Sequence, residues 1–266
     1  MKRPTALILR APGINCERET HHAFERAGAA SEYVHIKRLL EHPDLLDNFQ
    51  ILSVPGGFSY GDDISSGRVL AQEMKAKLGD RILRFVDRGG LALGICNGFQ
   101  VLVRLGMLPC LHDELAESVT LTHNLSNHYE CRWVTLKTRA SRCVFLPEGI
   151  TVRWPAAHGE GRLMTRDAAA LQQLLDDGFA AVQYVDDAGA ATERYPANPN
   201  GAPLGVAGLT NHNGRVLGVM PHPDRSYLPT HMPNWRRTRL ERGELPEDGD
   251  GMIVFREMVK VAAAEA

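Results

Sequence analysis

The sequence of 266 residues is poor in cysteine and lacks long apolar runs. Its five cysteines are few and odd in number, unlike the paired sets of disulfide-bonded secreted domains. No segment approaches the roughly 20 apolar residues of a membrane-spanning helix. The apolar run after Pro4 is too short for a signal peptide. These absences predict a cytoplasmic protein with reduced thiols and no membrane contact.

An excess of charge of one sign is also lacking. The chain has 30 basic and 32 acidic residues, so nothing supports a nucleic-acid partner. Glycine-rich phosphate loops and the His or Cys spacings of zinc sites are missing as well. We therefore expect neither a cofactor nor a metal in this chain.

Short apolar segments alternate with helical patterns in the first half. Strands are predicted at residues 5–10, 33–36, 51–54 and 91–95, and helices at residues 17–27, 65–88 (weakened by Gly79) and 98–105. This alternation is typical of an α/β fold with helices on both faces of a parallel sheet. The second half predicts strands, some of them antiparallel, at residues 133–136, 151–154, 180–184, 205–209 and 216–220, and a last helix at 252–264.

We expect residues 1–266 to form a single domain with an irregular insertion at about residues 226–251. The insertion carries three prolines, a tryptophan and several arginines. It is too long for an ordinary connection, which predicts a lid or a binding surface. A solvated loop without a role is the alternative.

Cys96 is the predicted nucleophile, because an apolar strand leads directly into it and a helix pattern follows. A nucleophile on such a turn protrudes from the edge of the sheet, and the helix N-terminus stabilises its thiolate. The sharp turn requires small neighbours, which Gly94 and Gly98 provide. Cys16 is the rival, but Glu17 and Glu19 beside it disfavour a thiolate, so we interpret Cys16 as a packing residue.

His222 is the predicted base for this thiol. Pro223 favours an extended conformation at His222, which would place Asp224 on the same side of the chain. The carboxylate could then orient one ring nitrogen and leave the other for Cys96. The glycine-rich turn after the strand 51–54 could supply an oxyanion donor at the same edge of the sheet.

Residues 94–100, Gly-Ile-Cys-Asn-Gly-Phe-Gln, carry the G-x-C-x-G-x-Q pattern of class I glutamine amidotransferases, which the chain resembles. Among these it is most similar to the glutaminase subunits of phosphoribosylformylglycinamidine synthase. The supporting motifs are residues 10–20, 55–62, 157–162, 195–201 and 220–223.

The resemblance implies a flavodoxin-like fold, with Cys96 as nucleophile and His222 as base. It also implies oxyanion donors at Gly57 and Asn97 and a glutamine-binding role for Gln100. The partners would be L-glutamine, a synthetase subunit that binds ATP and Mg, and a small third subunit. The synthetase would use the ammonia to convert formylglycinamide ribonucleotide to the formylglycinamidine product.

Two features depart from that family. Asp224 replaces the usual glutamate, so its contact with His222 must be closer or weaker. The insertion carries arginines that could touch the synthetase or its substrate phosphates, namely Arg236, Arg237, Arg239 and Arg242. The alternatives are a stand-alone hydrolase or chaperone-like protein of the PfpI type, an amidotransferase coupled to another synthetase, and a non-catalytic binding module.

Overall fold

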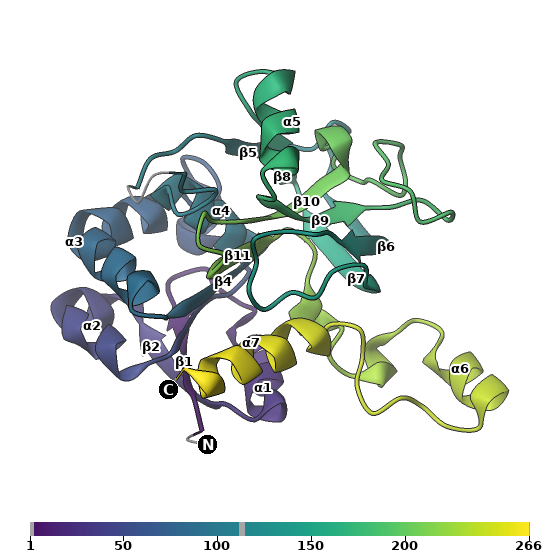
Figure 1. Cartoon of the computed structure of the whole chain (residues 1–266), viewed down its shortest axis with the longest axis horizontal. Helices are drawn as coiled ribbons and strands as arrows, with labels where there is room; N and C mark the ends of the chain where they lie inside the picture. The colour runs from purple at the N-terminus through teal and green to yellow at the C-terminus, as the bar shows by residue number, and fades with distance from the viewer. Residues whose placement is uncertain (1–2, 112–114, 266) are drawn as a thin grey trace.

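The computed structural model describes residues 3–111 and 115–265 and contains one large sheet surrounded by helices (Figure 1). Within these residues the sheet has nine strands, in the spatial order β2 (Ala30–His35), β1 (Thr5–Arg10), β3 (Ile51–Val54), β4 (Leu91–Ile95), β11 (Val216–Val219), β10 (Val206–Thr210), β9 (Ala180–Tyr184), β6 (Glu130–Thr138) and β7 (Thr151–His158). A separate two-stranded antiparallel sheet pairs β5 (Thr120–His123) with β8 (Glu160–Met164).

The sheet has a parallel part and an antiparallel part. From β2 to β11 all neighbours pair in parallel, and from β11 to β7 all neighbours pair antiparallel. The parallel strands follow the flavodoxin order, with β11 in the fifth place. The predicted α/β fold, with antiparallel strands from the second half, is therefore confirmed.

The helices are α1 (Glu17–Ala27), α2 (Ile36–Glu41), α3 (Arg68–Asp87), α4 (Asn97–Leu105), α5 (Ala168–Asp176), α6 (Trp235–Arg242) and α7 (Met252–Ala264). The crossover through α1 steps from β1 outward to β2, whereas the crossover through α3 steps from β3 the other way to β4. Because such crossovers are right-handed, α1 and α3 cover opposite faces. Helix α7 packs on α1, and α4 packs on α3. None of the described helices is long and apolar enough to cross a membrane.

Several predicted boundaries were wrong by a few residues. Ile36 starts α2 instead of ending β2, because the side chain of His35 caps that helix. Helix α3 begins only at Arg68, because Gly67 is in the left-handed conformation that interrupts a helix. It then continues through Gly79, the predicted weak point. Helix α4 begins at Asn97, immediately after Cys96.

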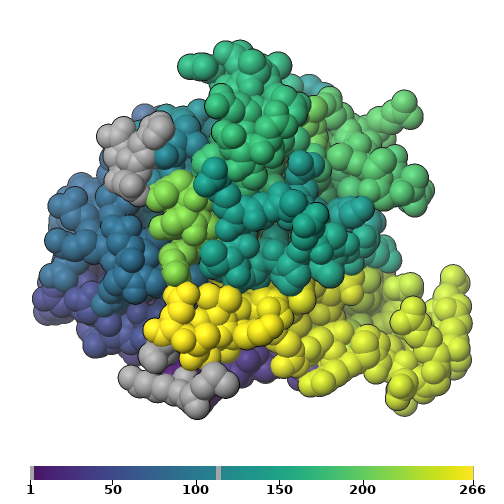
Figure 2. Space-filling view, in the orientation of Figure 1, coloured from purple at the N-terminus to yellow at the C-terminus, as the bar shows by residue number. Residues whose placement is uncertain are grey.

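The insertion at residues 226–251 forms an arm that extends from the body of the protein (Figures 1 and 2). Its base is closed by backbone hydrogen bonds from Gly249 to Tyr227 (2.9 Å) and from Gly251 to Ser226 (2.8 Å). Its tip contains α6, which has no buried residue. This helix was not predicted, because it has no apolar face to give the sequence a helical period.

Candidate active site

Cys96 occupies a sharp turn between β4 and α4. Its φ of 52° and ψ of −105° are unusual for a residue with a side chain, and such a conformation costs about 1–3 kcal/mol. The turn is held by the Cys96 N–H, which donates to Val219 O at 2.8 Å, and by the Gln100 N–H, which donates to Cys96 O at 3.1 Å. The fold therefore forces the side chain of Cys96 out of the strand at the carboxyl edge of the parallel sheet.

The neighbours of this turn must be small, as the sequence predicted. A Cβ atom on Gly98 would lie 1.8 Å from the carbonyl oxygen of Val54, and one on Gly94 would lie 2.6 Å from the carbonyl oxygen of Gly98. Both contacts involve backbone, which cannot move aside. The close approach of α4 to β3 and β4 therefore depends on glycine at both positions.

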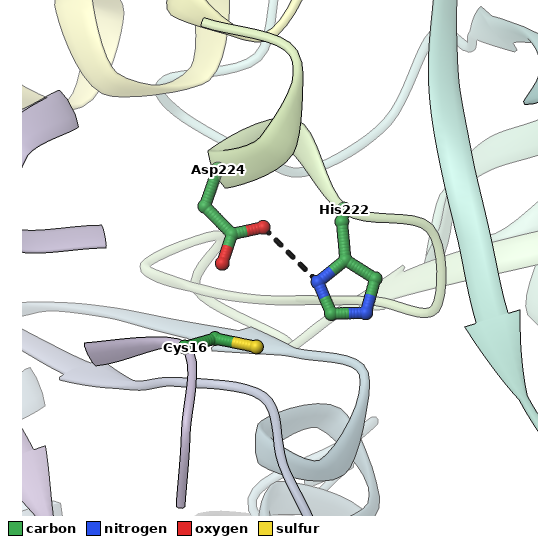
Figure 3. Close-up of side chains that lie close together, drawn as sticks. All are labelled: Cys16, His222 and Asp224. Carbon is green, nitrogen blue, oxygen red and sulfur yellow. Dashed lines mark hydrogen bonds and ion pairs between the residues drawn. The ribbon is translucent and has the colours of Figure 1, made fainter. Parts of the chain in front are cut away.

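His222 follows β11 and lies beside Asp224, both fully buried (Figure 3). Its Nδ1 is 3.1 Å from Oδ1 of Asp224, and its backbone N–H donates to Pro155 O at 2.8 Å. The contact between the two side chains was predicted, and His222 has the predicted extended conformation, but the chain does not stay extended as far as Asp224. Residues Pro223–Arg225 form a 3-10 turn, not an extended strand, and this turn brings the carboxylate to the ring.

The charges around His222 favour its protonated form. Burial alone would lower the pKa of the imidazole, but the Asp224 carboxylate and then the Cys96 sulfur outweigh it and raise the pKa well above 6.5. Cys96 Sγ also lies 3.6 Å from the carbonyl oxygen of Ala157 on β7. An imidazolium stabilised by a nearby sulfur and a carboxylate is the environment that a thiolate nucleophile requires.

Helix α1 contributes a side chain that contacts Asp224 of the His222–Asp224 pair. The hydroxyl of Thr20 is 3.2 Å from Oδ2 of Asp224 and 2.8 Å from the carbonyl oxygen of Cys16. Thr20 is fully buried, and its single hydroxyl hydrogen can go either to the carboxylate oxygen that His222 does not use or to the Cys16 carbonyl oxygen. No pattern in the sequence indicated this contact, because the two residues are 204 positions apart.

Cys16 lies closer to the predicted base than the sequence suggested. Its sulfur points toward the imidazole, and the sulfur, a ring nitrogen and a carboxylate oxygen of Cys16, His222 and Asp224 lie within 4.8 Å of one another (Figure 3). Burial, more than any carboxylate, raises the pKa of the Cys16 thiol, with Asp224 adding to the effect. The glutamates next to it in sequence are not among the main causes.

The same three residues have ligand atoms close enough to hold a metal ion, but each atom is already engaged. The carboxylate of Asp224 bonds His222 and Thr20, and Nη2 of Arg225 is 2.9 Å from the sulfur of Cys16. A guanidinium at that distance repels a cation. We interpret the group as hydrogen-bonded support for the imidazole.

A cavity of about 170 Å³ opens beside Cys96. It is lined by Gly57, Phe58, Asp62, Ser66, Cys96, Gln100, His123, Tyr129, Ala157, His158, Gly159 and Glu160. Gly57 has a φ of +143°, and a Cβ there would lie 2.5 Å from the carbonyl oxygen of Gly13. Only glycine therefore lets the backbone of this loop pack so closely on residues 13–15 at the edge of the cavity. The oxyanion role of Gly57 stays a prediction.

Asn97 and Gln100 connect helix α4 to the walls of the cavity. Oδ1 of Asn97 accepts from the Ser59 N–H at 3.0 Å, and its Nδ2 donates to Asp62 Oδ1 at 3.2 Å and to Gln100 Oε1 at 3.0 Å. Nε2 of Gln100 donates to the backbone oxygen of Glu160. The Gln100 amide therefore has protein partners at both ends, although the side chain lines the cavity. Its role in binding glutamine stays a prediction.

Comparisons with known proteins agree with this geometry. Residues 3–261 match the family of CobB/CobQ-like glutamine amidotransferase domains. The chain is 43% identical over 263 residues to phosphoribosylformylglycinamidine synthase subunit PurQ of Dehalococcoides mccartyi, covering 98% of this chain and 99% of that protein. It is 42% identical over 236 residues to PurQ of Methanococcus maripaludis, covering 88% and 87%.

Among solved structures, the PurLQS structure from Thermotoga maritima matches with a TM-score of 0.71 and 29% identity, covering 97% of this chain and 99% of the matched chain. The match extends over both the parallel and the antiparallel parts of the sheet. The family resemblance inferred from the motifs is therefore confirmed. The chain belongs to the glutamine amidotransferase family and, within it, to the PurQ subunits of phosphoribosylformylglycinamidine synthase.

Proposed function

We propose that this chain hydrolyses L-glutamine to glutamate and ammonia, and that a synthetase subunit uses the ammonia to convert formylglycinamide ribonucleotide to formylglycinamidine ribonucleotide. One observation carries the glutaminase part. Cys96 stands on a strained strand–helix turn, lines a cavity and interacts electrostatically with the buried His222–Asp224 pair. This is the arrangement of a nucleophile, a base and an orienting carboxylate.

In the first step, the sulfur of Cys96 attacks the side-chain amide carbon of glutamine. His222 holds the proton that the thiol gives up, and Asp224 keeps the imidazole oriented through Nδ1. The negative charge that develops on the amide oxygen is stabilised by the backbone N–H groups of Gly57 and Asn97. One such donor contributes roughly 3–4 kcal/mol of transition-state stabilisation in other enzymes.

In the second step, the imidazolium returns its proton to the amide nitrogen. The carbon–nitrogen bond breaks, ammonia leaves, and a γ-glutamyl thioester remains on Cys96. Water then attacks the thioester with His222 as the base, which releases glutamate and restores the thiol. His222 then gives the proton taken from water to the Cys96 sulfur, and so acts in turn as base, acid, base and acid.

The ATP-dependent part of the reaction belongs to the partner. ATP and Mg would bind the synthetase subunit, because this chain has no recognisable phosphate loop. The similarity to the PurLQS structure supports assembly with a synthetase and a small third subunit. The few cysteines and the absence of any disulfide among the described residues fit the reducing cytoplasm in which we place the complex.

The test is glutamate release from glutamine by wild type and by Cys96→Ala, each with and without the synthetase partner. We expect release by wild type with the partner and none by Cys96→Ala. The control is Cys131→Ala, because Cys131 is an exposed thiol. If Cys96→Ala kept its activity, Cys96 would not be the nucleophile and Cys16 would be tested next. If wild type released no glutamate with its partner, the glutaminase role would be refuted.

A further inference from the structure

His158, at the end of β7, has a buried nitrogen without a hydrogen-bond partner. Its side chain is 2% exposed, and within residues 3–111 and 115–265 nothing bonds its Nε2. A buried polar atom without a partner costs about 1–3 kcal/mol, so such an atom calls for an explanation. His158 also lines the cavity that contains Cys96, which suggests that a bound molecule supplies the missing partner.

Asn124 determines which nitrogen of His158 carries the proton. Its Nδ2 donates to the carbonyl oxygens of His128 at 2.9 Å and His158 at 2.8 Å, and its Oδ1 accepts from the Gly161 N–H at 3.1 Å. These three backbone contacts fix the orientation of the amide. The same Oδ1 is 3.1 Å from Nδ1 of His158, so Nδ1 must carry the hydrogen. Nε2 therefore presents a lone pair and can only accept.

The imidazole of His158 is neutral and held in place. Burial, together with the charge of nearby His222, lowers the pKa of His158 to about 3. The ring also packs tightly on Gly161, where a Cβ atom would lie 2.6 Å from both Cε1 and Nδ1. His158 thus offers a fixed acceptor that cannot itself give up a proton to a base through Nε2.

Glutamine brings two kinds of N–H donor to the cavity, the side-chain amide and the α-ammonium group. The ammonium group is positively charged, and the carboxylates of Asp62 and Glu160 line the same cavity and suit it better. The amide is attached to the carbon that Cys96 attacks. The sulfur of Cys96 lies 3.6 Å from the carbonyl oxygen of Ala157, the residue directly before His158. The amide is therefore the donor that fits His158 better.

We propose that Nε2 of His158 accepts a hydrogen bond from the leaving amide nitrogen of glutamine and then from the ammonia formed there. The proposal rests on the glutaminase function proposed above. His222 supplies the proton when the carbon–nitrogen bond breaks, while His158 gains none and only orients the nitrogen through a second N–H. Because neutral His158 has no proton on Nε2, it cannot convert the ammonia to ammonium, which would not react as a nucleophile.

The test compares His158→Asn with His158→Gln on two substrates. Asparagine can keep the donor toward Asn124 but does not reach the position of Nε2, whereas glutamine can place an oxygen acceptor there. The substrates are L-glutamine and the γ-methyl ester of L-glutamate, whose leaving group has no N–H. Initial rates of glutamate release are measured in the assembled complex, with thermal unfolding as the check that each variant is folded.

For L-glutamine we expect kcat of His158→Asn to fall by about tenfold or more, the loss of one hydrogen bond to a reacting group, with a smaller fall for His158→Gln. Hydrolysis of the ester should change little in either variant. An equal loss on both substrates would overturn the proposal, because His158 would then bind a part of glutamine that both share. An unchanged rate on glutamine would overturn it as well. If the glutaminase role itself were wrong, wild type would hydrolyse neither substrate, which is a different result.

Discussion

Nδ1 of His222 and Oδ1 of Asp224 lie 3.1 Å apart in a site that excludes solvent from both side chains. The 3-10 turn at Pro223–Arg225 bends the chain back and brings the Asp224 carboxylate to the imidazole. Thr20 from α1 then contacts the second carboxylate oxygen. Each carboxylate oxygen of Asp224 thus lies within hydrogen-bond distance of a protein group.

Replacing Asp224 by asparagine should reduce kcat for glutamate release by about 10²- to 10⁴-fold, because the imidazole loses both its orientation and the charge that stabilises its protonated form. Asp224→Glu keeps the charge and should lose less activity. The extra methylene must fit a fully buried space, so we expect the free energy of unfolding to fall by about 1–3 kcal/mol. Steady-state kinetics and denaturant unfolding check both variants. Equal kcat in wild type and Asp224→Asn would contradict the role of the carboxylate.

Replacing Gly98 by alanine should lower the free energy of unfolding by about 3 kcal/mol, since the new Cβ would be 1.8 Å from the Val54 carbonyl oxygen. The matched control is Gly79→Ala within α3. Its Cβ would meet only the end of the Leu115 side chain, at 3.1 Å, and alanine favours a helix over glycine by about 0.5–1 kcal/mol. Urea unfolding measures the free energy of unfolding of both variants. Similar values for Gly98→Ala and Gly79→Ala would contradict the requirement for glycine at position 98.

The lowered pKa of His158 should make the fold less stable in acid. Unfolded histidine binds a proton near pH 6.5, whereas folded His158 does so only near pH 3, so the unfolded state holds more protons between these values. Stability contributed by neutral His158 is therefore lost as the pH falls from 6.5 toward 3, by up to about 1.4 kcal/mol per pH unit.

This loss is measured by urea unfolding of wild type and His158→Gln at a series of pH values. Wild type should lose stability more steeply than the variant. His42→Gln serves as the control, because the side chain at that position is exposed. His222 is present in all three proteins and has a raised pKa, so its stabilisation acts in the opposite direction, being lost as the pH rises above 6.5. Parallel curves for wild type and His158→Gln would show that His158 is not neutral in the fold.

The arm at residues 226–251 should be needed for the partner and not for the fold. Replacing residues 230–245 by a short Gly-Ser linker leaves the backbone hydrogen bonds at its base, so we expect the melting temperature to stay the same. Binding to the synthetase and partner-dependent glutamate release should both weaken. A second variant changes only Arg236, Arg237, Arg239 and Arg242 to alanine. It separates the effect of the arm's positive charge from the effect of its length. Normal assembly and turnover after the deletion would leave the arm without this role.

The sequence alone was sufficient to predict the α/β class and to single out Cys96 as the candidate nucleophile. The strand at Leu91–Ile95, the flanking glycines and the following helix are local, and the steric limits of a sharp turn act on adjacent residues. His222 was also predictable from its place after a strand. Local patterns could not predict helix α6, since it is not stabilised by a buried face.

Only the tertiary structure decided which distant groups surround these residues. Thr20 and Asp224, 204 positions apart in sequence, meet because α1 begins and β11 ends at the same edge of the sheet. Asn124 fixes the tautomer of His158 across 34 positions. Hydrogen bonds and pKa values depend on distances in space and on burial, which no spacing along the chain expresses. The sequence thus determined the turn that carries Cys96, the predicted nucleophile, and the sheet that presents it, and folding determined which charges and hydrogen bonds surround them.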